Sequence, residues 1–187
     1  MSTTDSPSVN EHGLNREGWL TAFAEAITPV IKDRTGVKVD LSKTRLSCGF
    51  PRTRATPSRK TGKVTIGQCL MGHKSGISEI MISPLRDTII AEKAPGEWHG
   101  IAETIIHELL HAALPLGTGH KAPFARAAKA MGLEGKPTET FAGSELADLI
   151  KEIAAPLGAY PHAAIDGDFG TKQTTRLLKV MCVDCGF

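Results

Sequence analysis

The chain has 187 residues, of which 41% are hydrophobic, and this suggests one domain with a core and perhaps a small appendage. No apolar run reaches the roughly eighteen residues that a membrane span needs, which argues against an integral membrane protein. Four cysteines in this length do not make a disulfide scaffold, and a formal net charge of +2 by itself favours no partner.

The N-terminus, MSTTDSPSVNEHG, is polar and has no apolar segment of the kind that secretory signals contain. We therefore expect a disordered lead-in over residues 1–14 and a cytoplasmic protein.

A first helix is predicted over residues 15–34, because apolar side chains recur there at helical spacing. Asn15 can cap it, Gly36 ends it, and Pro29 is a place where it would kink or divide. Short β-rich segments separated by Pro, Gly and Ser follow, and they predict an antiparallel sheet of three or four strands. These segments are 37–39, 44–50, 63–70 and 78–83.

Three more helices are expected over residues 97–114, 122–131 and 144–154. Pro115 would end the first of them. Gly132 would close the second, and Ser144 would cap the third. The remaining 157–187 segment reads as a C-terminal extension, mostly loop, with a strand over 177–180.

The most informative motif, His107-Glu108-Leu109-Leu110-His111, lies in the first of these three helices. Residues four apart lie on one helical face, so His107 and His111 can bind one metal ion. Glu108, one step round the helix, can take a proton from water at that metal. The surrounding residues are apolar, and a bound Zn²⁺ would offset the cost of burying these polar groups.

The third metal ligand is expected to be His120, because Gly117 and Gly119 let the chain turn back after the helix. Phe124 would pack beneath that turn. HExxH also occurs by chance in helices, and a downstream glutamate, Glu139 or Glu145, is an alternative ligand.

A basic stretch runs from residue 41 to residue 78 and contains eight Lys or Arg but no Asp or Glu. It would suit weak, non-specific contact with a phosphate backbone, for which Arg52, Arg54, Arg59 and Lys60 are the candidates. A solvated loop balanced by acids elsewhere is the alternative.

Cys182 and Cys185 have the spacing of half a zinc ribbon, but the second cysteine pair that a closed site needs is missing. Truncation of a longer chain, a zinc shared by two chains, or a vestigial half-site would each explain this. We favour truncation or a vestige, and hence one zinc per chain.

These motifs together resemble the SprT-like metallopeptidases, especially their phage and bacterial forms. The matching pieces cover most of residues 60–187 and fall in family order. They read IGQC (66–69), SEIMISP (78–84), HELLHAA (107–113), GHKAPF (119–124), MGLEGKPTET (131–140), YPHA (160–163) and TRLLKVMCVDCGF (175–187). The sequence has Lys121 where the family usually has a second glycine after the histidine.

The resemblance implies a zincin-like α+β fold over residues 15–156, in which a small antiparallel sheet packs with the HExxH helix. It implies zinc on His107, His111 and His120, and Glu108 as catalytic base. The eukaryotic relative Spartan degrades proteins crosslinked to DNA, so the implied partners are a protein or peptide substrate and non-specific DNA. We expect a monomer, in the host cytoplasm if the chain is phage-encoded.

The sequence alone thus predicts a zinc endopeptidase. It assigns no residue to stabilise the oxyanion: Tyr160 and His162 are candidates, and the alternative is that this loop only packs. Two other functions stay open. One is a nucleic-acid-associated binding protein whose zinc site is structural or inactive. The other is a hydrolase of a non-peptide bond, because zinc activates water for many substrates.

Overall fold

The structure, a computed structural model, describes residues 9–52, 64–72, 74–89 and 100–165. Within them the fold is α+β, with four α-helices, one three-stranded sheet and one two-stranded sheet. The expected strand at 177–180 and the cysteine pair at 182 and 185 lie outside the described residues, as do residues 53–63 of the basic stretch.

The first helix, α1 (Arg16–Thr35), is one continuous helix through Pro29. Asn15 caps it by accepting a hydrogen bond from the Gly18 N–H, and Gly36 ends it in the left-handed conformation, as the sequence predicts. Its apolar side enters the core, with Trp19, Phe23 and Ile27 fully buried.

The main sheet has the strand order β1-β3-β2, formed by β1 (Thr44–Cys48), β2 (Gly67–Met71) and β3 (Ser78–Ile82). β2 and β3 are antiparallel, but β1 and β3 are parallel, so the prediction of an antiparallel sheet was wrong. The chain leaves β1 at one edge, returns as β2 at the other edge, and only then forms the central strand.

Several predicted strand boundaries also need correction. Residues 37–39 form no strand, and the strand expected over 63–70 occupies Gly67–Met71. The strand expected over 44–50 ends at Cys48. One face of the sheet supplies core residues such as Ile80 and Ile82, while the strand pattern turns Glu79 and Met81 the other way.

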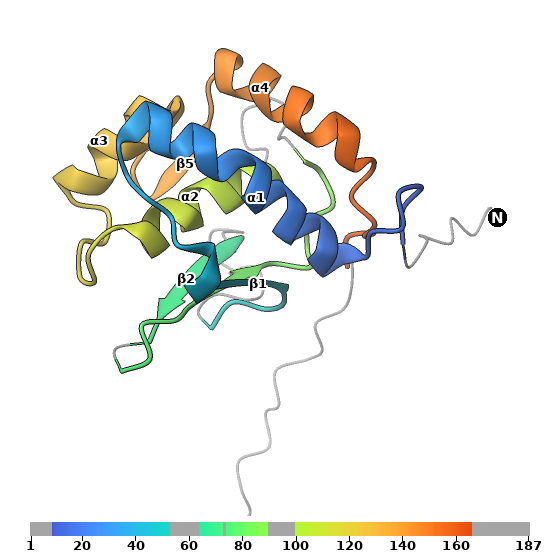
Figure 1. Cartoon of the computed structure of the whole chain (residues 1–187), viewed down its shortest axis with the longest axis horizontal. Helices are drawn as coiled ribbons and strands as arrows, with labels where there is room; N and C mark the ends of the chain where they lie inside the picture. The colour runs from blue at the N-terminus through green and yellow to red at the C-terminus, as the bar shows by residue number, and fades with distance from the viewer. Residues whose placement is uncertain (1–8, 53–63, 73, 90–99, 166–187) are drawn as a thin grey trace, which may run out of the picture.

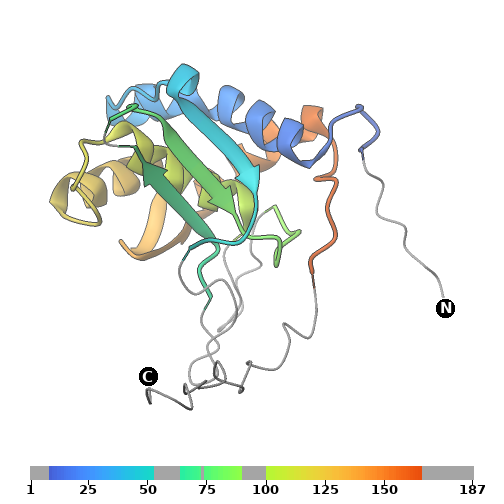
Figure 2. The ribbon, with the colours of Figure 1, turned by 90° about the horizontal axis from the view of Figure 1, so that it is seen from below.

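Helix α2 (Ile101–Ala113) packs over β2 and β3 and against α1. Its N-cap is Gly100, and Leu114 ends it in an extended conformation, as expected for the residue before Pro115. Figure 1 shows α1 and α2 on the same side of the sheet, and Figure 2, seen from below, shows the sheet in front of the helices. α2 is therefore central, with β2 and β3 on one side and further helices on the other.

After α2 the chain forms α3 (Ala122–Met131), a hairpin and α4 (Ser144–Ala154). The hairpin pairs β4 (Leu133–Lys136) with β5 (Glu139–Ala142) and was not predicted. The predicted cap of α4 was wrong by one residue, because Gly143 is the N-cap and Ser144 is the first helical residue. Gly143 is buried and its N–H donates to Gly132 O (3.0 Å), which fixes the start of the helix through backbone packing.

The two ends of the described chain meet at the start of α1. The buried Asn10 side chain donates to the carbonyls of Leu157 (2.7 Å) and Ala159 (2.9 Å), and Trp19 Nε1 donates to Gly158 O (3.0 Å). The expected disordered lead-in of residues 1–14 lies outside the described residues only up to residue 8. From Asn10 onward this segment takes part in the packing around α1.

Candidate metal centre

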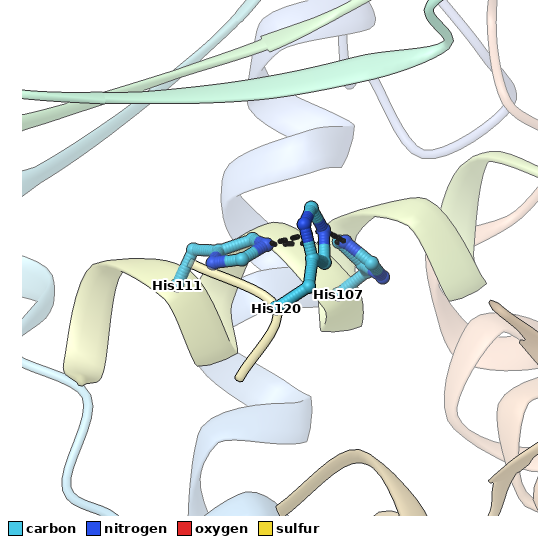
Figure 3. Close-up of side chains that lie close together, drawn as sticks. All are labelled: His107, His111 and His120. Carbon is cyan, nitrogen blue, oxygen red and sulfur yellow. Dashed lines mark hydrogen bonds between the residues drawn. The ribbon is translucent and has the colours of Figure 1, made fainter. Parts of the chain in front are cut away.

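Three histidines converge on one side of α2. His107 and His111 lie one helical turn apart in α2, and His120 comes from the loop between α2 and α3 (Figure 3). Gly117 (φ 83°) and Gly119 (φ 50°) take positive φ values in that loop, which side chains other than glycine adopt at a cost. The turn therefore returns His120 toward the helix, as the sequence predicted.

The Nε2 atoms of the three imidazoles form a small triangle. The separations are 3.2 Å from His107 to His111, 3.2 Å from His107 to His120 and 3.1 Å from His111 to His120. Two nitrogen ligands about 2.05 Å from a tetrahedral metal ion stand about 3.3 Å apart. The triangle is close to that spacing, and the three residues together can hold a metal ion.

Hydrogen bonding among the rings does not by itself account for this arrangement. Each Nε2 atom either carries a proton or presents a lone pair. With three nitrogens in mutual contact, at least one pair must therefore join two donors or two acceptors. A cation facing three lone pairs satisfies all three nitrogens at once.

Burial favours the neutral form of His111 and His120, which metal ligation requires. It lowers the pKa of His111 to about 4, with a smaller contribution from the neighbouring His120, and it also lowers the pKa of His120. Both rings therefore present lone pairs at neutral pH.

Phe124 forms a fully buried platform beneath the three rings. Its ring stacks on His111 at a centroid distance of 4.2 Å and lies 4.7 Å from His107 and 5.1 Å from His120. Phe124 lies in the first turn of α3, directly after the His120 loop, which confirms the predicted packing.

Glu108 lies against strand β2. A Cβ atom added to Gly67 would lie 2.9 Å from Glu108 Oε1 and 2.4 Å from Thr104 Cγ2, so helix and strand approach closely only because residue 67 is glycine. The Glu108 side chain is buried, and desolvation raises its pKa to about 8 although a hydrogen bond with the backbone of Cys69 opposes this. A cation nearby would favour the carboxylate form.

One residue of the site was not assigned a role from the sequence. Thr140 on β5 is buried, and its Oγ1 lies 2.7 Å from His107 Nδ1, the ring nitrogen that faces away from the triangle. Nothing in the spacing of the motif points to a residue 33 positions later, because the contact depends on a hairpin that was itself not predicted.

The alternative ligands lie elsewhere. Glu145 forms an ion pair with Arg34 (3.0 Å), and its side chain is 85% exposed. Glu139 is exposed on β5, and neither glutamate belongs to the histidine cluster.

The oxyanion candidates make contacts away from the histidine cluster. Tyr160 packs near the start of α1, and His162 lies next to the segment just after the end of β3. The Tyr160 ring packs edge-on against Trp19 at 5.2 Å, and its pKa is raised by burial and by the nearby Cys48 thiol. His162 Nε2 contacts Pro84 O at 2.9 Å. These contacts give both residues a packing role.

The basic stretch is described only in part. Lys43 pairs with Asp40 (3.9 Å) and Arg45 with Glu79 (3.1 Å), so acids balance these two charges. Arg52 is exposed. Arg54, Arg59 and Lys60 lie outside the described residues, and so do Cys182 and Cys185.

Comparison of the chain with models of protein families, with curated proteins and with solved structures finds no match. The resemblance to the SprT-like family therefore rests on the motifs alone. Among the described residues, every helix is too short or too polar to cross a membrane.

Proposed function

We propose that the chain is a zinc-dependent metallopeptidase of the SprT-like type, with zinc on His107, His111 and His120 and with Glu108 as the general base. The observation that favours it is three Nε2 atoms within 3.2 Å of one another, two of them from the helix that also buries Glu108. A purely structural metal site would have no need of that carboxylate.

The donor set favours zinc. Imidazole nitrogen is a preferred ligand of Zn²⁺, and three protein ligands with a fourth position left over are typical of catalytic sites. Zinc held there would supply Lewis acidity, which acidifies water and polarises a carbonyl group. His120 is exposed, so the site is open to solvent and to a substrate on that side.

Glu108 is suited to accept and return a proton. It follows His107 directly in α2 and is therefore turned about 100° from it around the helix axis. Its burial against Gly67 and Thr104 restricts the carboxylate to few positions, which favours proton transfer. In the proposed reaction Glu108 takes a proton from water and passes it to the leaving amine.

The position of β2 favours a peptide as the substrate. Among the described residues β2, the strand that carries Gly67, pairs only with β3, so its other edge presents backbone donors and acceptors. An extended peptide can add to such an edge through main-chain hydrogen bonds. A substrate bound there would run past the helix that carries Glu108 and the histidines.

The test is cleavage of casein, and of the chain itself, by the zinc-loaded protein. We expect hydrolysis that a chelator abolishes, that zinc restores and that Glu108→Gln does not show. Addition of DNA to the same assay tests the DNA association that the resemblance implies. Zinc-dependent hydrolysis of esters or phosphodiesters without any peptide cleavage would replace this proposal by the non-peptide alternative.

A further inference from the structure

The β4–β5 hairpin lies alongside α2 and is joined to it at two points. Glu103 Oε2 accepts a hydrogen bond from the Ala142 N–H (2.7 Å), and His107 Nδ1 contacts Thr140 Oγ1 (2.7 Å). Residues 103 and 107 are one helical turn apart, about 6 Å, and residues 140 and 142 are two strand residues apart, about 6.7 Å. The spacings match, so the two contacts form an antiparallel ladder between helix and strand.

Two side chains of this ladder, Glu103 and Thr140, are buried, and His107 is half-buried. Glu103 is 2% exposed and Thr140 is 8% exposed. The second oxygen of Glu103 accepts the backbone N–H of Gly100, so the same carboxylate caps α2 and holds β5. Gly135, opposite Thr140 in the hairpin, has φ 91°, and a Cβ there would lie 2.7 Å from Glu139 O. The close backbone packing between Gly135, across the hairpin, and Glu139, the residue before Thr140, thus fixes the position of Thr140.

The contact at His107 has a consequence for ligation. Nε2 can bind a metal only through its lone pair, so the ring proton must then be on Nδ1. From there it can donate to Thr140 Oγ1. A hydrogen bond at the remote nitrogen of a ligand histidine fixes the tautomer and the ring orientation.

His107 differs in this from the other two histidines. Among the described residues, the structure gives no hydrogen-bond partner for the Nδ1 atom of His111 or of His120. The protein therefore orients these two rings mainly through Phe124, whereas it also holds His107 by a directional bond.

We infer that Thr140 is a positioning residue for the metal site and that Glu103 holds it in place through β5. This inference rests on the metal site of the proposed function, but not on peptide hydrolysis. The hairpin then supports the site. This accounts for the buried hydroxyl of Thr140 on β5 and the buried carboxylate of Glu103 on α2, at the contact between strand and helix.

Metal affinity measured by chelator competition with Zn²⁺ and Co²⁺ tests this inference. Thr140→Val, which keeps the shape and removes the acceptor, should weaken binding about 10- to 100-fold. Thr140→Ser, which keeps the hydroxyl, should bind within a few-fold of wild type. Thr138→Val makes the same change at an exposed position in the turn of the same hairpin and should leave affinity unchanged.

The Co²⁺ absorption spectrum and the imidazole ¹H–¹⁵N spectrum separate positioning from general loss of structure. We expect Thr140→Val to change the Co²⁺ bands and to reduce the Nδ1–H tautomer of His107 even without metal, while its metal-free melting temperature stays near that of wild type. Glu103→Gln should weaken binding less, and its effect should not add to that of Thr140→Val.

Wild-type metal affinity and an unchanged His107 tautomer in Thr140→Val would overturn the inference, whether or not the protein cleaves peptides. Weakened affinity in Thr140→Val, rescued in Thr140→Ser, would support it even if casein remained intact, and only the proposed peptidase activity would then fail. A wild-type protein that binds neither metal would overturn both.

Discussion

Glu108 is the residue on which the proposed hydrolysis depends. Glu108→Gln keeps the size of the side chain but removes its capacity to accept a proton, so we expect activity on casein to fall at least about 100-fold. Zinc content should remain at the wild-type level, because the three imidazoles are unchanged. Glu145→Gln, the same change at an exposed residue of α4, should retain full activity. Substantial hydrolysis by Glu108→Gln would mean that another group is the base.

Phe124 supports the rings from below, and its effect on metal binding can be separated from its effect on stability. Phe124→Leu should lower the free energy of unfolding by about 1–3 kcal/mol, as expected for a smaller buried side chain. It should also weaken zinc binding, because all three imidazoles pack on the lost ring.

Phe23→Leu is the matched control for Phe124→Leu. Phe23 is also fully buried, but its ring stacks on Trp19 in α1, whereas the ring contacts given for the histidines are with Phe124 and with one another. Its loss should destabilise the metal-free protein to a similar extent and leave zinc affinity unchanged. Equal effects of the two changes on zinc affinity would show that Phe124 acts only through overall stability.

At the scale of elements, the sequence predicted the parts of the site that are local in the chain. His107, Glu108 and His111 follow from the helical period, and His120 follows from a proline that ends the helix and glycines that reverse the chain. These rules need no knowledge of the rest of the fold, because each concerns residues that lie close together in the sequence.

The parts that the sequence did not predict depend on long-range packing. The parallel pairing of β1 with β3 brings together residues 34 apart in the chain, such as Arg45 and Glu79, and no local pattern distinguishes it from a hairpin. The segment Leu133–Lys136 has no β-branched residue and contains a glycine, so its propensity for a strand is weak. Pairing with β5, which packs on α2, and contact with α3 override that propensity. Thr140 belongs to this hairpin and was missed with it.

The close approach of α2 to β2 gives a prediction at the same scale. Gly67→Ala would place a methyl group 2.4 Å from Thr104 and 2.9 Å from Glu108, so helix and strand must separate or Glu108 must rotate. We expect a destabilisation of about 1–3 kcal/mol, as for overpacked cores. Peptidase activity should fall while zinc affinity changes little.

Gly49→Ala provides the control for this change. Gly49 directly follows β1, and a Cβ there would meet nothing within 4 Å. Gly49→Ala should therefore leave stability and activity near the wild-type values. If Gly67→Ala were equally harmless, the helix and strand would have more room than the structure gives them.

For the whole molecule, the histidine site joins the central helix to a loop at the surface. His107 and His111 belong to α2 at the centre of the core, whereas His120 belongs to an exposed loop that leads into α3. A metal ion on all three ties that loop and α3 to the central helix. Because the unfolded chain does not hold the three rings together, metal binding adds to the stability of the folded state.

This linkage gives a measurable shift in melting temperature. At a free zinc concentration one hundred times the dissociation constant, binding adds about 2.7 kcal/mol. For a chain of this size each kcal/mol corresponds to about 2–4 °C, so removal of zinc should lower the melting temperature by about 5–11 °C. His111→Ala should melt near the metal-free temperature and respond little to zinc, whereas His12→Ala, at an exposed histidine outside the cluster, should respond like wild type. A wild-type melting temperature that is the same with zinc and with chelator would show that the three histidines do not form a metal site that stabilises the fold.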